Sequence, residues 1–177
     1  MPTIMSHAVA AAALATALTS GRRLPPLFWT LCVVVATVPD VDVVAYAFAL
    51  PRGSMWAHRG ITHSLPVAAV TSVVIAVMAR RRLPLGRVRV SVCLAVAMAS
   101  HGILDACTDG GTGVAFLAPF DATRYFAPWR PLVVSPIGIA FFSEWGVRTL
   151  LSELGWIWLP AALLVLVVAA TRTGQES

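Results

Sequence analysis

Long apolar stretches that carry almost no charge constrain this chain more than any other feature. Hydrophobic residues make up 58% of its 177 residues, charged residues only 12%, and the mean hydropathy is +0.82. An ordinary soluble domain carries about 25% charged residues, and a disordered chain combines low hydrophobicity with high charge. Both classes are therefore excluded. The composition predicts a protein whose chemistry lies in or on a lipid bilayer.

The apolar runs predict an all-α membrane protein with about five transmembrane helices in a single domain over residues 1–177. A span needs roughly 20 apolar residues, and Pro39 is expected to break or cap the second run because proline lacks the helical amide hydrogen. Residues 108–154 hold no such run and are rich in Gly, Pro and aromatics, so we expect a long, partly irregular extracytoplasmic segment there. The expected helices are residues 6–18, 26–50, 65–79, 88–107 and 155–170.

All thirteen basic residues are arginines, and the net charge is +5. They form short clusters between apolar runs, which is typical of topology signals, so no nucleic-acid partner is expected. With the triple-arginine turn at 80–82 in the cytoplasm, the positive-inside rule predicts an outer N-terminus, five crossings and an outer loop at residues 58–63. The arginines expected inside are Arg22, Arg23, Arg80, Arg81, Arg82, Arg87, Arg89 and Arg172. Those expected outside are Arg52, Arg59, Arg124, Arg130 and Arg148.

Three cysteines, an odd number, lie inside or at the end of apolar segments, so the sequence predicts no disulfide framework. Core filling is the expected role of Cys32 and Cys93. Cys107 lies near a polar motif, which leaves metal binding open as an alternative for its thiol.

All four histidines and three of the five aspartates fall into a few short motifs. Asp40 and Asp105 each lie sixteen residues from the same expected membrane edge, which is about 24 Å of helix. The hydrocarbon core is about 30 Å thick, so both carboxylates are expected near its outer boundary. His101 lies one turn deeper than Asp105 on the same helical face. Four segments are therefore expected to place His or Asp side chains at the same depth in the membrane. These residues are His7, Asp40, Asp42, His58, His63, His101 and Asp105.

This set of imidazoles and carboxylates predicts a divalent metal site with one or two ions. Such ligands favour Zn, Mn or Fe, with Zn expected first. Each ionisable side chain at membrane depth costs roughly 2.5 to 3.5 kcal/mol, and a bound cation would offset that cost. Each motif alone has a plainer interpretation, namely a surface hydrogen bond between His101 and Asp105, a turn at 39–42, and an interfacial loop at 58–63.

The order of these motifs resembles the bacterial inner-membrane metal-dependent hydrolases of the YdjM-like type. The resemblance covers nearly the whole chain up to Glu144, and it implies a multi-span helical fold in the inner membrane and a hydrolase activity without a defined substrate. Where some members carry another histidine after the second aspartate, this chain has Val43. The motifs are His7, Pro39-Asp40-Val41-Asp42, His58-Arg59-Gly60-Ile61-Thr62-His63-Ser64, Ser100-His101-Gly102-Ile103-Leu104-Asp105, Thr108, Gly111 and Pro119-Phe120.

Two further residues are candidates for catalysis. The forked guanidinium of Arg59 could hold a phosphate or carboxylate group, or it could pair with Asp40 or Asp42. Glu144 lies in the outer stretch, where it could act as a general base or a further ligand, or it could be a charge at a helix N-terminus.

The leading hypothesis is a hydrolase in which metal activates water to attack an ester, phosphoester or amide. A site at the outer boundary favours a lipid or envelope substrate and contact with membrane lipids. The alternative is a divalent metal transporter or another non-enzymatic metal-binding membrane protein. A transporter, however, is expected to carry charged residues at mid-membrane or at both faces. A purely structural role would leave the His/Asp set unexplained.

Overall fold

The computed structural model describes residues 1–46, 48, 50–51 and 53–176, so Arg52 lies outside the described residues. The predicted all-α class is confirmed, because the described residues contain no strand and only isolated bridges between Thr108 and Leu132 and between Val114 and Tyr125. The α-helices are α1 (Ile4–Leu18), α2 (Pro26–Thr37), α3 (Leu65–Ala79), α4 (Arg87–Ala106), α5 (Glu144–Glu153) and α6 (Leu159–Glu176). The 3₁₀ and π segments are η1 (Val38–Tyr46), η2 (Ile61–His63), η3 (Gly138–Phe142) and η4 (Leu154–Trp158).

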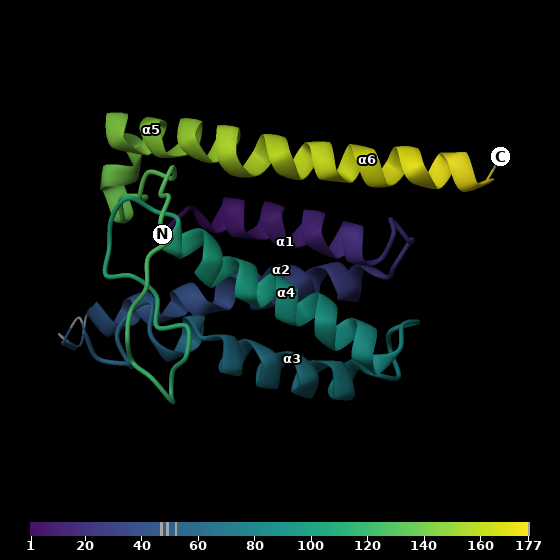
Figure 1. The fold of residues 1–177 in the computed structure, drawn as a ribbon, viewed down its shortest axis with the longest axis horizontal. Coiled ribbons are helices and arrows are strands. Elements are labelled where there is room, and N and C mark those ends of the chain that lie inside the picture. Colours follow the sequence, from purple (N-terminus) through teal and green to yellow (C-terminus); the bar gives the residue numbers. More distant parts are fainter. Residues whose placement is uncertain (47, 49, 52, 177) are drawn as a thin grey trace.

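The long helices run alongside one another (Figure 1). Helices α1 to α4 form a bundle, and α6 lies along α1 on its outer side. The α1–α2 turn, the α3–α4 turn and the C-terminal end of α6 share one end of the bundle, which we call the arginine end. The N-terminus and the irregular segment lie at the opposite end (Figure 1).

Small side chains let the bundle helices approach closely. Ala11 of α1 and Phe28 and Cys32 of α2 are fully buried, and Cys93 and Leu94 of α4 pack in the same core. Alanine at helix contacts allows the backbones to come near each other, as is typical of helices packed in membranes. Cys32 and Cys93 are therefore core residues, as predicted.

Within the described residues, three helices are long and apolar enough to cross a membrane, namely Pro26–Val44, Arg87–Ala106 and Glu144–Thr173. Helices α1 and α3 are apolar but have 15 residues each. That length gives about 22 Å of rise, which is less than a hydrocarbon core of about 30 Å.

The predicted break at Pro39 takes the form of a tighter helix. The α2 backbone passes at Val38 directly into the 3₁₀ segment η1, which carries Asp40 and Asp42. Proline removes one backbone donor, and 3₁₀ turns are frequent at the C-terminal end of an α-helix. The change of helix type therefore sets where the two aspartates point.

The last helix begins at Glu144, earlier than the predicted start at about residue 155. Ser143 caps its first turn by accepting a hydrogen bond from the backbone of Trp145. Charged residues interrupt the apolar pattern of α5, so a hydropathy argument could not find it. The π turn η4 follows just before Pro160, where proline cannot complete a regular helical hydrogen bond. The irregular segment therefore ends at the short 3₁₀ turn η3 and not at residue 154.

Candidate metal centre

The structure brings all seven predicted ligands to the end of the bundle opposite the arginine end. His7 comes from α1, the aspartates at 40 and 42 from η1, and His101 and Asp105 from the last two turns of α4. His58 lies in the turn before η2, and His63 ends η2. Their side chains range from fully buried to 7% exposed. The seven side chains therefore come together at one end of the bundle, as the estimate from helix rise predicted.

Five of these residues surround one point, and we call them the five-donor cluster: His7, Asp40, His63, His101 and Asp105. Each of the last four offers a ligand atom, and these atoms all lie within 4.8 Å of one another. The Nε2 atom of His7 completes the set, 3.7 Å from Asp105 Oδ1 and 3.9 Å from Asp40 Oδ2. Its ring stacks on that of His101 with centroids 3.7 Å apart.

The separations within the cluster fit ligands that share one ion. His101 Nε2 lies 3.3 Å from Asp40 Oδ1, and His63 Nε2 lies 3.4 Å from Asp105 Oδ2. Nitrogen and oxygen ligands at about 2.0 to 2.1 Å from a tetrahedral zinc ion are roughly 3.3 Å apart. The donor spacing therefore suits a divalent ion of that size.

The hydrogen bonds around two of the histidines direct their Nε2 atoms into the cluster. His101 Nδ1 lies 2.7 Å from the carbonyl oxygen of Ala36, an acceptor, so this nitrogen carries the proton. His63 Nδ1 lies 3.0 Å from Thr62 Oγ1 and 3.2 Å from Asp42 Oδ2. Metal-binding histidines commonly donate their other ring N–H to a carbonyl or carboxylate in this way.

Several buried polar atoms of the cluster have no hydrogen-bond partner in the described part of the chain. They are both ring nitrogens of His7 and both carboxylate oxygens of Asp40 and Asp105. The Nε2 atoms of His63 and His101 lie only 2.9 Å apart. Burying carboxylates without hydrogen bonds is costly, and a cation between these atoms would satisfy them together. The donor set therefore fits a divalent metal ion.

Asp42 and His58 lie beside the five-donor cluster. Asp42 accepts hydrogen bonds from His58 Nδ1 at 2.5 Å, from Thr62 Oγ1 at 2.5 Å and from the backbone N–H of Arg59 at 3.2 Å. With His63, these two residues form a second group whose ligand atoms lie within 4.8 Å of one another. The seven predicted ligands thus divide into a central set and an adjoining pair.

Arg59 pairs with a different aspartate from either of the two predicted. Its Nε atom lies 3.1 Å from Asp105 Oδ2, and Asp42 accepts only its backbone N–H. The guanidinium also donates to Gly110 O and to Thr108 Oγ1, each at 3.0 Å. The side chain is 1% exposed, and its backbone has a φ of 64°. The left-handed backbone turns Arg59 inward, where it holds Asp105.

Glu144 is not brought to the cluster. Its side chain is 92% exposed and lies 3.8 Å from Arg148 at the start of α5. The α5 cap at Ser143 places this first turn facing outward. The structure therefore agrees with the alternative interpretation of Glu144 as a charge at a helix N-terminus.

A different glutamate is fully buried near the cluster and was missed by the sequence analysis. Glu153, at the end of α5, accepts hydrogen bonds from the backbone N–H of Thr3 at 2.5 Å and from its hydroxyl at 2.6 Å. It also accepts one from Ser6 Oγ at 2.6 Å. A single carboxylate close to an apolar run of membrane length is the signal that could have found it.

The electrostatics of the cluster favour positive charge at its centre. Burial lowers the pKa of His63, but the neighbouring carboxylates of Asp105, Asp40 and Asp42 outweigh burial and raise this pKa to about 10. The carboxylates thus stabilise a cation at this position, whether a proton or a metal ion.

Comparison with known proteins agrees with the resemblance drawn from the motifs. The profile of the YdjM inner membrane protein family matches residues 1–176. The chain is 36% identical over 166 residues to inner membrane protein YbcI of Escherichia coli strain K12, which covers 93% of this chain and 95% of that protein. No solved structure matches the chain.

Proposed function

The chain belongs to the YdjM inner membrane protein family, and on this premise we propose that it is a metal-dependent hydrolase of the bacterial inner membrane. The observation that carries the proposal is the five-donor cluster. Three imidazoles and two carboxylates meet in a buried place where the carboxylate oxygens lack hydrogen-bond partners within the described residues. A membrane protein has little reason to bury such groups together unless they bind a cation.

The histidines and carboxylates favour zinc, with manganese or iron as the other candidates. Held by the cluster, such an ion would supply Lewis-acid chemistry and make water nucleophilic at neutral pH. The adjoining group of Asp42, His58 and His63 is where a second ion would bind.

The protein's own residues supply the remaining functions. Arg59 holds the Asp105 carboxylate at 3.1 Å, and Asp42 orients His63. Asp42 also accepts the Nδ1–H of His58 at 2.5 Å. In a histidine–carboxylate pair of this kind, the carboxylate orients the ring and stabilises its protonated form. When only the five-donor cluster holds an ion, we therefore assign His58 as the group that takes the proton from the attacking water.

A lipid or another envelope ester, phosphoester or amide is the proposed substrate class, cleaved at the extracytoplasmic face. The segment around the cluster carries exposed apolar side chains, which supports a site that meets the membrane interface. Phe120 is 84% exposed, Trp129 61% and Phe142 87%. Side chains of this kind favour contact with lipid at the interface over contact with bulk water.

Metal analysis of the purified full chain, combined with a hydrolysis screen, tests the proposal. We expect at least one tightly bound divalent ion, and its stoichiometry should fall in Asp105→Asn and His63→Ala. His58→Gln should keep the ion in the five-donor cluster and lose turnover of the responsive substrate. The screen would use a lipid extract, phospholipids and generic esters.

The matched control is Glu144→Gln, because this exposed carboxylate lies outside the cluster. It should change neither metal content nor turnover. Folded protein that never holds metal would refute the proposal. Protein that holds metal, turns over no substrate class and moves the ion across sealed vesicles would support a metal transporter instead.

A further inference from the structure

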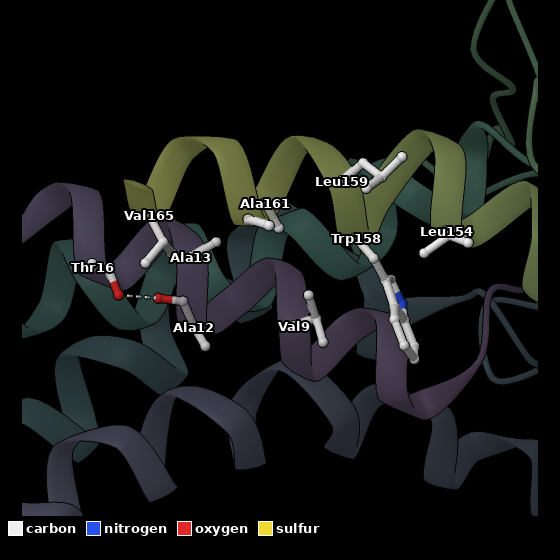
Figure 2. Close-up of a pocket in the computed structure, with 10 residues that line it drawn as sticks. Val9, Ala12, Ala13, Thr16, Leu154, Trp158, Leu159, Ala161 and Val165 are labelled. Carbon is white, nitrogen blue, oxygen red and sulfur yellow. Dashed lines mark hydrogen bonds between the residues drawn. The ribbon is translucent and has the colours of Figure 1, made fainter. Parts of the chain in front are cut away.

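A groove of about 520 Å³ lies between α1 and α6 (Figure 2). Val9, Ala12 and Thr16 of α1 line one wall, and Trp158, Ala162 and Val165 line the other. Because Ala12 and Ala162 have small side chains, the facing surfaces of the two helices leave space between them. The volume falls within the range of about 300 to 1,000 Å³ that is usual for ligand sites.

The walls of this groove offer mostly hydrocarbon to an occupant. The hydroxyl of Thr16 donates to the carbonyl of Ala12 at 2.8 Å within α1, as Figure 2 shows. The indole N–H of Trp158 donates to Ser6 Oγ at 2.7 Å. The other lining side chains are alanine, valine and leucine. An alkyl chain is the partner that matches such a surface without leaving polar groups unpaired.

At the arginine end, the groove continues into a second hollow of about 410 Å³ that is basic. The two cavities share Thr16 and Val165, and the second is lined by Arg23 and Arg172. Arg172 Nη1 donates to the carbonyl of Gly21 at 2.5 Å, which places its guanidinium at the α1–α2 turn. The apolar groove is thus continuous with a hollow lined by two arginines.

We propose that this groove binds an anionic glycerophospholipid, with one acyl chain between α1 and α6 and the phosphate at Arg23 and Arg172. Basic pockets between transmembrane helices bind anionic lipid head groups, and guanidinium groups suit phosphate. The wall from Leu154 to Val165 extends about 16 Å, a length that accommodates much of an acyl chain. From the head group, this chain runs inward along the helices, as a lipid in a bilayer does.

This lipid is bound and is not a substrate of the metal centre. Arg172 lies nineteen residues beyond Glu153, which is about 28 Å along the helix. The head group is therefore at the opposite end of the bundle from the five-donor cluster. The inference is independent of the hydrolase proposal, and either can fail without the other.

Native mass spectrometry of the detergent-solubilised full chain tests the assignment, with phosphatidylglycerol or phosphatidylcholine added. We expect one phosphatidylglycerol bound at least tenfold more tightly than phosphatidylcholine. Each arginine near a membrane surface contributes about fivefold to such binding, so R23Q/R172Q should weaken phosphatidylglycerol binding at least tenfold. R81Q/R82Q removes the same charge from the α3–α4 turn, outside the groove, and should change binding less than twofold.

A second pair of variants tests the apolar part of the groove. Ala162→Trp fills the groove and should weaken phosphatidylglycerol binding about tenfold, whereas Leu163→Trp, outside the lining, should leave it unchanged. Circular dichroism would establish that all variants keep their helices. Equal binding of both lipids by every variant would overturn the proposal. So would a dimer that Ala162→Trp dissociates and added lipid does not, because the groove would then bind a second copy of the chain.

Discussion

Ser6 donates a hydrogen bond of 2.6 Å to Oε2 of Glu153, and Ser6 is the residue directly before His7. The same carboxylate accepts two hydrogen bonds from Thr3, the N-cap residue of α1. Trp158, one turn beyond Glu153, donates to Ser6 as well. The last long helix thus holds the first turn of α1, and with it the imidazole of His7, at the five-donor cluster.

We predict that Glu153→Gln lowers metal affinity about tenfold through its effect on His7. Hydrogen bonds to a charged acceptor contribute about 1.5 to 3 kcal/mol, and their loss would let the first turn of α1 shift. The measurement is a competition titration against a chelator of known affinity. In a His7→Ala background the same substitution should change affinity less than twofold, because His7 no longer contributes.

Such a double-mutant cycle separates positioning from general stabilisation. A residue that only stabilises the fold would weaken metal binding in both backgrounds by similar factors, and that result would contradict the prediction. Glu144→Gln, on the same helix but exposed, is the matched control and should bind metal like the parent.

A second prediction concerns Gly111, which lies against Arg59. A Cβ atom there would lie 2.6 Å from Arg59 Nη1, and the backbone φ of Gly111 is 94°. The guanidinium cannot easily move aside, because Asp105, Thr108 and Gly110 hold it from three directions. Gly111→Ala should therefore disturb the Arg59–Asp105 pair. Breaking a buried ion pair costs about 3 to 5 kcal/mol.

Gly138→Ala is the matched control, since Gly138 has a φ of 70° and open space where its Cβ would stand. This variant should lose only about 1 to 2 kcal/mol of stability, which is the cost of a left-handed backbone conformation for a residue other than glycine. Thermal unfolding in detergent and metal titration would compare the two variants. Equal losses of stability, with metal affinity unchanged in both, would show that Arg59 does not need the space at Gly111.

The position of the site could be predicted from the sequence, because helix rise fixes how deep a residue lies in a membrane. Asp40 and Asp105 were each placed by counting from an arginine cluster, and they meet as expected. Specific pairings could not be predicted in this way. Arg59 reaches Asp105 because its φ is 64°, and nothing in the local sequence requires that backbone conformation.

Long-range contacts explain what the sequence analysis missed. Glu153 finds its partners about 150 residues away, and such a contact leaves no local pattern. The start of α5 was missed for a different reason: its charged residues break the apolar periodicity, and its helix depends on the cap at Ser143. Hydropathy therefore located the apolar helices better than the amphipathic one.

A third prediction is that metal affinity rises with pH between about 6 and 8. The carboxylates around His63 hold its pKa at about 10 in the metal-free protein, despite burial. His63 is therefore protonated throughout this range and must release one proton when its Nε2 binds metal. The logarithm of the affinity should increase by about one for each pH unit from this residue alone.

Chelator competition at pH 6, 7 and 8 would measure this slope. In His63→Gln the slope should decrease by about one, because the side chain that releases the proton is gone. Affinity that is independent of pH in the parent protein would contradict the assignment of His63 as a ligand.

The final prediction concerns which membrane face holds the metal centre. The two turns with Arg22, Arg23 and Arg80 to Arg82, together with the C-terminal end of α6, lie at one end of the bundle (Figure 1). Arg89 and Arg172 contact the α1–α2 turn at this end through the carbonyls of Leu18 and Gly21. The positive-inside rule predicts that this end faces the cytoplasm, so the cluster should face outward.

Two glycines offer matched positions for a labelling test, Gly53 near the cluster and Gly86 at the arginine end. Both are exposed and have open space where a side chain would stand. On a background that lacks Cys32, Cys93 and Cys107, a cysteine at Gly53 should react with an impermeant thiol reagent in intact cells, and one at Gly86 only after lysis. The reverse pattern would move the metal centre to the cytoplasmic face, where soluble metabolites would join inner-leaflet lipids as accessible substrates.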